Sequence, residues 1–219
     1  MSDYLWFEGM PFPGLGYTKE LLEEICDKFV VRDEDTVILT YPKSERSPWI
    51  DNEEGYQLLI NRKGPRLITY HLPFHIFSRS FFSSNAKVNV IRYPRDVLVS
   101  GYFFWCKTNL VKNPESLSTY FEWFLKGNVA YGSWFKHTCA WMSMRKMDNF
   151  RVLSYEDMKK DTRKIIEKIC DFLGKKLEPD ELDMVLKYSS FQAMKENKMS
   201  NFSLITEDEV TNRLVLLRN

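Results

Sequence analysis

The sequence VNVIRYPRDVLVSGY, residues 88–102, is the clearest indication of the fold of this chain. Its first part, residues 88–92, is rich in β-branched and aliphatic residues, which is typical of a short buried strand. Pro94 then breaks the strand, and Asp96 favours the start of a helix because a carboxylate stabilises a helix N-terminus. A buried strand that passes through a polar turn into a helix is the building unit of α/β domains.

Other parts of the chain repeat this pattern. Strand-like runs occur at residues 36–40, 66–71 and 150–155. Helical patterns occur in three further places. One begins at Thr18, one covers residues 117–126 between Ser116 and Gly127, and one extends from a cap at Asp161 to Gly174. The sequence therefore predicts one α/β domain over residues 1–219, with a mostly parallel central sheet flanked by helices. Ligands of such a sheet bind at the carboxyl ends of its strands.

Composition and charge exclude several classes of partner. The 219 residues include 31 Lys and Arg and 30 Asp and Glu, which leaves a formal charge of +1. We therefore expect no strong attraction to nucleic acid or to an anionic membrane surface.

The sequence also indicates a cellular compartment. The four cysteines show no CxxC spacing, which favours a reducing compartment over a disulfide framework or a zinc site. The first residues lack the pattern of a signal peptide, and no apolar run is long enough to span a bilayer. These observations predict a cytoplasmic protein.

Lys43 and Ser44 follow the first predicted strand, where a lysine and a helix N-terminus can hold a phosphate or sulfate. Taken alone, a solvated loop lysine is the better interpretation of Lys43. Pro42 stands where the Walker pattern has glycine, so a nucleotide kinase with a magnesium site is not supported.

His71 ends the second predicted strand, where its imidazole can take a proton from a hydroxyl at neutral pH. A histidine held by a backbone carbonyl is an equally good interpretation of this position alone. His75 and His137 lack such a location, and we interpret both as structural.

Arg92 and Ser100 can together bind a phosphate group, the first through its guanidinium fork and the second through its hydroxyl. A salt-bridged turn between Arg95 and Asp96 is compatible with that role.

Aromatic residues are dense at Phe12, Tyr17, Trp49 and residues 102–105. Some of them are expected to line an apolar pocket for a rigid hydrophobic ligand, although a larger core or a partner surface is the commoner explanation.

Three motifs together resemble the cytosolic sulfotransferases. They are TYPKS at residues 40–44, RYPRDVLVSGY at residues 92–102 and SSFQAMK at residues 189–195. The stretches WFEG at residues 6–9 and MKENKMSN at residues 194–201 are similar to the hydroxysteroid branch, which sulfates steroid alcohols and bile acids.

The resemblance implies a P-loop-like sulfotransferase fold and a donor, 3'-phosphoadenosine 5'-phosphosulfate (PAPS), with no metal. The product nucleotide would be 3'-phosphoadenosine 5'-phosphate (PAP). It implies His71 as the catalytic base and Lys43 on the sulfate side of the donor. The remaining donor contacts that it implies are Ser44, Arg92, Ser100, Tyr155, Ser189, Phe191 and Arg218. Its implied acceptor residues are Phe12, Tyr17, Trp49, His71, Phe104, Trp105 and Phe202.

The sequence departs from the family pattern in three places. Ser44 passes directly to Glu45, where relatives continue with a glycine-containing loop and a long helix. The strand before Arg92 is one residue short, so we expect a slipped register or a bulge. Of the family's Arg-Lys-Gly triplet near the end of the chain only Arg218 is present, and the segment with the usual homodimer motif does not follow it. The alternative function is therefore a non-catalytic relative that binds hydrophobic ligands but not the donor.

Overall fold

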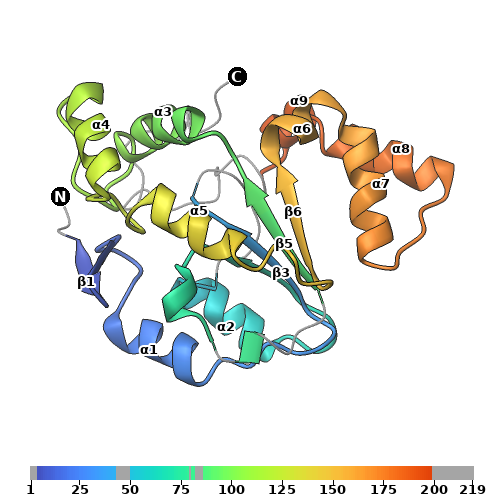
Figure 1. The fold of residues 1–219 in the computed structure, drawn as a ribbon, viewed down its shortest axis with the longest axis horizontal. Helices are drawn as coiled ribbons and strands as arrows, with labels where there is room; N and C mark the ends of the chain where they lie inside the picture. Colours follow the sequence, from blue (N-terminus) through green and yellow to red (C-terminus); the bar gives the residue numbers. More distant parts are fainter. Residues whose placement is uncertain (1–3, 43–49, 79, 82–85, 199–219) are drawn as a thin grey trace.

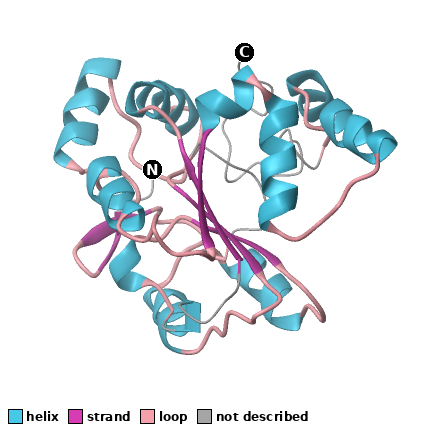
Figure 2. Ribbon diagram, turned by 45° about the vertical axis from the view of Figure 1, so that its right-hand side comes forward, coloured by secondary structure: helices cyan, strands magenta, loops and turns pink. Residues whose placement is uncertain are grey.

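Four parallel strands form the central sheet of the computed structural model, which describes residues 4–42, 50–78, 80–81 and 86–198. The strand order is β4-β3-β5-β6, so the chain crosses over between strands rather than turning back on itself. The helix predicted at residues 117–126 lies in the connection between β5 and β6. Figure 2 shows the strands at the centre of the molecule with helices around them. The strands are β3 (Thr36–Thr40), β4 (Leu67–Tyr70), β5 (Ala86–Ile91) and β6 (Phe150–Ser154).

Helices cover both faces of this sheet, with α6 to α9 on one side of it in Figure 1. A small cluster joins Val88, Val90 and Leu153 of the sheet to Ile165 of α7. The larger core fills the opposite face, where Val37 and Leu39 of β3 meet the remaining helices. The helices are α1 (Lys19–Asp27), α2 (Glu53–Asn61), α3 (Pro94–Trp105), α4 (Leu117–Lys126), α5 (Trp134–Met142), α6 (Tyr155–Lys160), α7 (Thr162–Phe172), α8 (Pro179–Tyr188) and α9 (Phe191–Glu196), and η1 (Phe74–Ile76) is a 3-10 turn.

The predicted helix boundaries are confirmed by their caps. The Thr18 hydroxyl accepts a hydrogen bond from the Leu21 N–H at 3.1 Å and begins α1. Ser116 caps α4, which ends at Gly127 in a left-handed conformation with φ of 76°. Asp161 caps α7. In each case a side-chain oxygen or a glycine satisfies the backbone groups at a helix end.

The expected bulge in β5 is absent from its ladder. Residues 86–90 pair in unbroken register with β3, and residues 87–91 pair in the same way with β6. The regular alternation instead turns Lys87 and Asn89 toward the face of the larger core, where their exposed fractions are 0% and 3%. The backbone of β5 is therefore regular, and two of its polar side chains are buried.

A small antiparallel hairpin precedes the sheet and was not predicted. It consists of β1 (Leu5–Phe7) and β2 (Met10–Phe12). Glu8 and Gly9 form its turn with φ of 48° and 73°. The hairpin is connected to the rest of the molecule through the Pro11 carbonyl, which accepts a hydrogen bond from the Tyr131 N–H at 2.8 Å.

Two predictions about compartment can be compared with the structure. All four cysteines are free thiols. Among the helices that the structure describes, none combines the length and the hydropathy of a bilayer-spanning segment.

Candidate functional site

The carboxyl edge of the sheet gathers several predicted site residues, because all four strands run in the same direction. His71 follows β4, Arg92 follows β5, and Tyr155 follows β6. Tyr41 follows β3, and Lys43 comes two residues later, just outside the described residues. The predicted base and the predicted phosphate-binding arginine thus follow strands that end at the same edge.

His71 is almost completely buried, with 1% of its surface exposed. Its Nδ1 atom lies 3.4 Å from Oδ1 of Asp51, which has an exposed fraction of 0%. The His71 ring also packs against the ring of Tyr131, with 5.6 Å between centroids. A carboxylate behind an imidazole is the arrangement that orients a histidine for proton transfer.

Two tyrosines complete the polar cluster around Asp51. The Tyr17 hydroxyl donates to Oδ2 of Asp51 at 3.4 Å and is hydrogen-bonded to the Tyr131 hydroxyl. Burial, followed by the nearby Asp51 charge, raises the pKa of Tyr131 well above its usual value. Tyr131 therefore stays neutral and keeps its hydroxyl proton at physiological pH.

His137 fixes the main chain of the predicted base. Its Nε2–H donates to the backbone carbonyl of His71 at 3.1 Å, and its ring packs edge-on against Tyr41. Burial lowers the pKa of His137 to about 3, so this side chain is neutral at physiological pH. The structural interpretation of His137 agrees with this geometry, and His75 is exposed on η1.

The described part of the predicted donor site centres on Arg92. Its half-buried guanidinium lies over the ring of Tyr155, 4.5 Å from the centroid. Ser100 is half-buried on α3, the helix that follows Arg92. Glu156 joins the two strand ends, because its carboxylate accepts hydrogen bonds from the Tyr93 N–H at 2.9 Å and from the Ser154 hydroxyl at 3.0 Å. A fixed cation, a hydroxyl and an aromatic ring suit a phosphorylated adenosine.

Two further predicted donor residues lie at the C-terminal helices α8 and α9. Ser189 is exposed at the end of α8, and its hydroxyl donates locally to the Leu186 carbonyl at 3.2 Å. Phe191 is half-buried at the start of α9. Several predicted site residues fall outside the described residues, so their placement stays a prediction: Lys43, Ser44, Trp49, Phe202 and Arg218.

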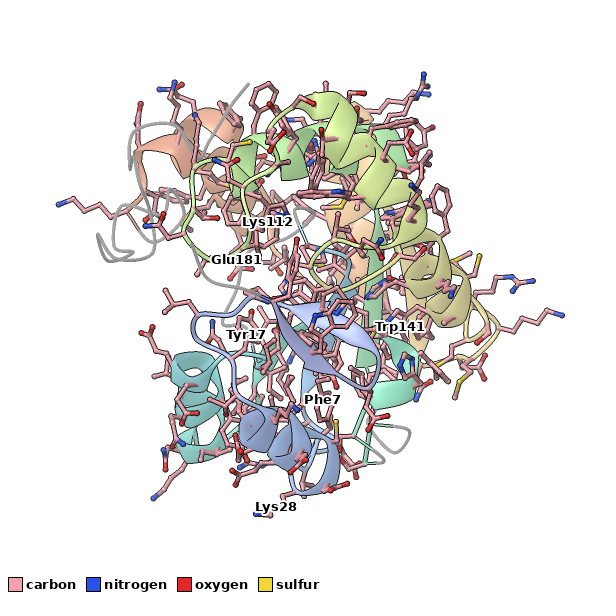
Figure 3. The ribbon with its side chains drawn as sticks, turned by 90° about the vertical axis from the view of Figure 1, so that its left-hand side faces the viewer. Phe7, Tyr17, Lys28, Lys112, Trp141 and Glu181 are labelled. Carbon is pink, nitrogen blue, oxygen red and sulfur yellow. The ribbon has the colours of Figure 1, made fainter. Side chains whose placement is uncertain are left out.

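The predicted acceptor residues that the structure describes belong to the larger core. Phe12 packs against Tyr17 and Tyr131 with centroid distances of 6.3 and 5.6 Å, and Phe104 packs against Trp105 at 4.8 Å. Figure 3 shows Tyr17 beside the N-terminal hairpin, to which Phe7 belongs. These four aromatic residues and His71, the fifth described residue of the set, are all buried, and a larger core accounts for the four aromatic residues in this structure.

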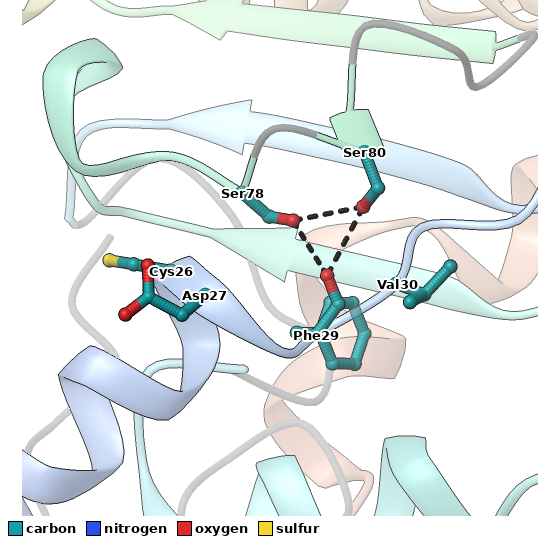
Figure 4. A pocket seen from close by; sticks show the side chains of 6 residues that line it. All are labelled: Cys26, Asp27, Phe29, Val30, Ser78 and Ser80. Carbon is teal, nitrogen blue, oxygen red and sulfur yellow. Dashed lines mark hydrogen bonds between the residues drawn. The ribbon is translucent and has the colours of Figure 1, made fainter.

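Neither of two surface hollows contains these residues. One, of about 190 Å³, lies beside α1 and is lined by Cys26, Phe29, Val30 and Ser78 among others (Figure 4). Its serine hydroxyls are already hydrogen-bonded to the Phe29 carbonyl, and burial raises the pKa of the Cys26 thiol to about 11. The second, of about 210 Å³, lies between β6 and α7.

Sequence reasoning missed Asp51, Tyr131 and Glu156. Asp51 comes two residues after Trp49, and no motif marks it. Nothing in the sequence distinguishes Tyr131 from the other aromatic residues, although its neighbour Gly132 indicates a turn. Within the described ranges, no group of three or more His, Cys, Asp and Glu side chains is arranged to hold a metal ion.

Known proteins resemble this chain over its whole length. The model of the sulfotransferase domain matches residues 5–216. Mouse sulfotransferase 2A1 is 63% identical over 246 residues, which cover 100% of this chain and 86% of the mouse protein. The 3-beta-hydroxysteroid sulfotransferase of Cavia porcellus is 52% identical, also with 100% and 86% coverage. The matched span of the mouse protein is longer than the 219 residues here, so that relative carries residues that this chain lacks.

A solved structure agrees with the fold. Mouse sulfotransferase SULT7A1, in a complex with PAP, superposes with a TM-score of 0.81 at 27% identity, covering 89% of this chain and 76% of that one. With a family model across nearly the whole chain and relatives of more than 50% identity, this chain belongs to the sulfotransferase domain family.

Proposed function

We propose that this chain transfers a sulfuryl group from PAPS to a hydroxyl of a steroid, bile acid or similar hydrophobic alcohol, in the cytoplasm. The observation that carries the proposal is the buried His71, whose imidazole contacts Asp51 and whose backbone carbonyl is bound by His137, at the same sheet edge as Arg92. The names of the two relatives and the PAP complex of the solved structure support the acceptor and the donor.

The donor-binding residues have different roles along the carboxyl edge of the sheet. Arg92 and Ser100 hold the 3'-phosphate, and Tyr155 offers its ring to the adenine. Lys43 compensates the charge that develops on the leaving phosphate. These cations fit a nucleotide donor because the chain has almost no net charge and must bind an anion locally.

His71 acts as the general base. Its Nε2 takes the proton of the acceptor hydroxyl while the hydroxyl oxygen forms a bond to sulfur. The bond between sulfur and the bridging phosphate oxygen breaks, and its electron pair stays on that oxygen, which leaves PAP as the second product. Alignment of the attacking oxygen, sulfur and leaving oxygen is the main contribution of such a site.

The non-catalytic alternative makes a different prediction about the donor. A relative that binds only hydrophobic ligands would lack affinity for PAP, whereas the enzyme binds it. Calorimetric titration of the protein with PAP separates the two functions, because the enzyme gives a saturating isotherm and the alternative gives none.

The variant His71→Ala tests the assigned base. Sulfuryl transfer from PAPS to a 3-hydroxysteroid is expected to fall by about 10²–10⁴-fold, the usual contribution of a general base. The dissociation constant for PAP is expected to change less than threefold. Normal turnover by this variant would show that His71 is not the base. His75→Ala, on the exposed η1 turn, is the matched control and retains wild-type turnover.

A further inference from the structure

We propose that Asp51 is a positioning residue that fixes the tautomer and the orientation of His71. This inference rests on the proposed function and extends it, since it assigns the residue that makes the imidazole a competent base. The juxtaposition that carries it is a buried carboxylate bonded on one oxygen to an imidazole and on the other to a tyrosine hydroxyl.

The carboxylate of Asp51 uses its two oxygens for different partners. Oδ1 faces Nδ1 of His71 at 3.4 Å, and Oδ2 accepts from the Tyr17 hydroxyl at 3.4 Å. Asp51 and His71 are 0% and 1% exposed, so water does not compete for these contacts. In such surroundings a hydrogen bond is stronger than in water, and its geometry is more strictly defined.

The backbone on both sides of Asp51 is fixed. The Ile50 N–H donates to the Thr69 carbonyl at 3.2 Å, which anchors the chain beside β4. On the other side, the Asn52 side chain caps α2 by accepting from the Gly55 N–H at 2.8 Å. Asp51 is thus held between a bond to the neighbouring strand and a helix cap, and its carboxylate has little freedom to leave His71.

The backbone conformation of Tyr131 is strained, which indicates that forming this cluster costs conformational energy. Its φ of 67° lies in the left-handed region, which a tyrosine rarely adopts. Hydrogen bonds hold the turn in place: the Tyr131 N–H donates to Pro11, and the Tyr41 hydroxyl donates to the Gly132 carbonyl at 2.7 Å. Strained backbone of this kind concentrates at functional sites. Here it brings the Tyr131 hydroxyl to Tyr17 and its ring to His71.

The chemical consequence concerns which ring nitrogen carries the proton. A carboxylate accepts only, so the neutral imidazole places its proton on Nδ1, between the ring and Asp51. Nε2 then has a free electron pair for the proton of the acceptor hydroxyl. Once that proton is transferred, the same carboxylate stabilises the imidazolium. A buried carboxylate behind a catalytic histidine acts in this way in other enzyme classes.

A purely structural role is the competing explanation for a buried aspartate, and the chain contains an example. Asp35 forms a buried ion pair with Arg66 at the amino end of β3. Its carboxylate also accepts from the Arg32 and Arg66 N–H groups at 2.8 and 3.1 Å. Asp35 therefore has a cation for a partner and lies at the opposite edge of the sheet from His71. Asp51, in contrast, has its carboxylate between an imidazole and a phenol.

Asp51→Asn tests the proposal, because the amide keeps the shape but no longer requires a proton on Nδ1. We expect kcat for sulfuryl transfer to fall by tenfold or more, as removal of an orienting carboxylate usually does. The KM for the steroid and the dissociation constant for PAP are expected to stay within threefold. Asp35→Asn is the matched control: its melting temperature falls, while kcat per folded protein is unchanged.

The ¹⁵N chemical shifts of His71 in the wild-type protein supply a readout that does not depend on how the variant folds. They are expected to report the tautomer protonated on Nδ1, and in Asp51→Asn a shift toward the one protonated on Nε2. A wild-type His71 protonated on Nε2, or a kcat loss below tenfold in folded Asp51→Asn, would overturn the proposal. The His71→Ala variant separates this outcome from failure of the proposed function. If His71→Ala is inactive and Asp51→Asn is active, only the role of Asp51 is wrong.

Discussion

His137 supports the site without taking part in the reaction. Its ring must be neutral and must carry a proton on Nε2 to donate to the His71 carbonyl. Burial meets the first condition by lowering its pKa to about 3, far below the value of about 6.5 of an exposed histidine. The unfolded chain therefore binds a proton at this position over a pH range in which the folded chain does not.

This difference predicts a loss of stability on acidification. A group whose pKa is depressed by folding stabilises the protein above its unfolded pKa, and that contribution is lost as the pH falls toward its folded pKa. Between pH 7 and pH 5, His137 should reduce the free energy of unfolding by about 2 kcal/mol. Urea unfolding of the wild type and of His137→Gln at both pH values measures this contribution. Glutamine keeps a donor but does not titrate, so its pH dependence should be flatter by that amount.

His75→Gln is the control for this measurement, since His75 is exposed and its replacement should leave the wild-type pH dependence unchanged. Parallel pH curves for the wild type and His137→Gln would show that the buried ring is not the titrating group.

At the level of single residues, the sequence correctly predicted that His71 and Arg92 lie at strand ends, because each directly follows a run of strand-forming residues. It did not predict Asp51 or Tyr131, since their partners lie 20 and 114 positions away along the chain. No local spacing encodes such contacts. The positive φ of Tyr131 could not be predicted either, because tyrosine has no preference for that conformation.

Strand β5 keeps a regular backbone although two of its polar side chains are buried. Lys87 is buried 4.9 Å from the centroid of the Phe81 ring, and burial lowers its pKa. Asn89 is 3% exposed, and its Nδ2 has no hydrogen-bond partner in the described structure. A buried amide without a partner destabilises a fold by about 1–3 kcal/mol.

Replacement of Asn89 by leucine, which has a similar shape, is therefore expected to stabilise the protein by about 1–3 kcal/mol. The midpoint of urea unfolding measures the effect. Asn61→Leu, at the exposed end of α2, is the matched control and should change stability by less than about 0.5 kcal/mol. A destabilised Asn89→Leu variant would mean that the amide has a partner when the protein is in solution.

Elements with strong local signals were predicted well. The run at residues 36–40 matches β3, and the caps at Thr18, Ser116 and Asp161 begin the helices that they predicted. The N-terminal hairpin was missed because strands of three residues carry too few side chains for an alternating pattern. Of the slipped register or bulge expected in β5, the bulge is absent, because the backbone groups of the strand pair without interruption with both neighbours.

For the molecule as a whole, the proposed single domain and the proposed donor site are linked. Arg92 and Tyr155 follow the neighbouring strands β5 and β6, which belong to the sheet that organises both cores. A ligand bound there by the folded protein alone should stabilise the entire domain and not one part of it.

PAP at 100 times its dissociation constant is therefore expected to stabilise the protein by about 2.7 kcal/mol. Differential scanning calorimetry should show one transition that moves upward by about 5–10 °C. Arg92→Ala should lose most of this shift at the same PAP concentration. Arg151→Ala should retain it, since Arg151 is an exposed residue of β6 whose guanidinium lies over the Phe172 ring. Two separate transitions, with only one moved by PAP, would contradict a single domain.

The hydrogen bond between Pro11 and Tyr131 connects the small N-terminal hairpin to the proposed reaction centre. If His71 is the base, we expect variation in residues 5–12 to change turnover while the main sheet stays the same. Selection screens that randomise only the residues at the carboxyl edge of the sheet would not sample these positions, whereas libraries built on the hairpin would.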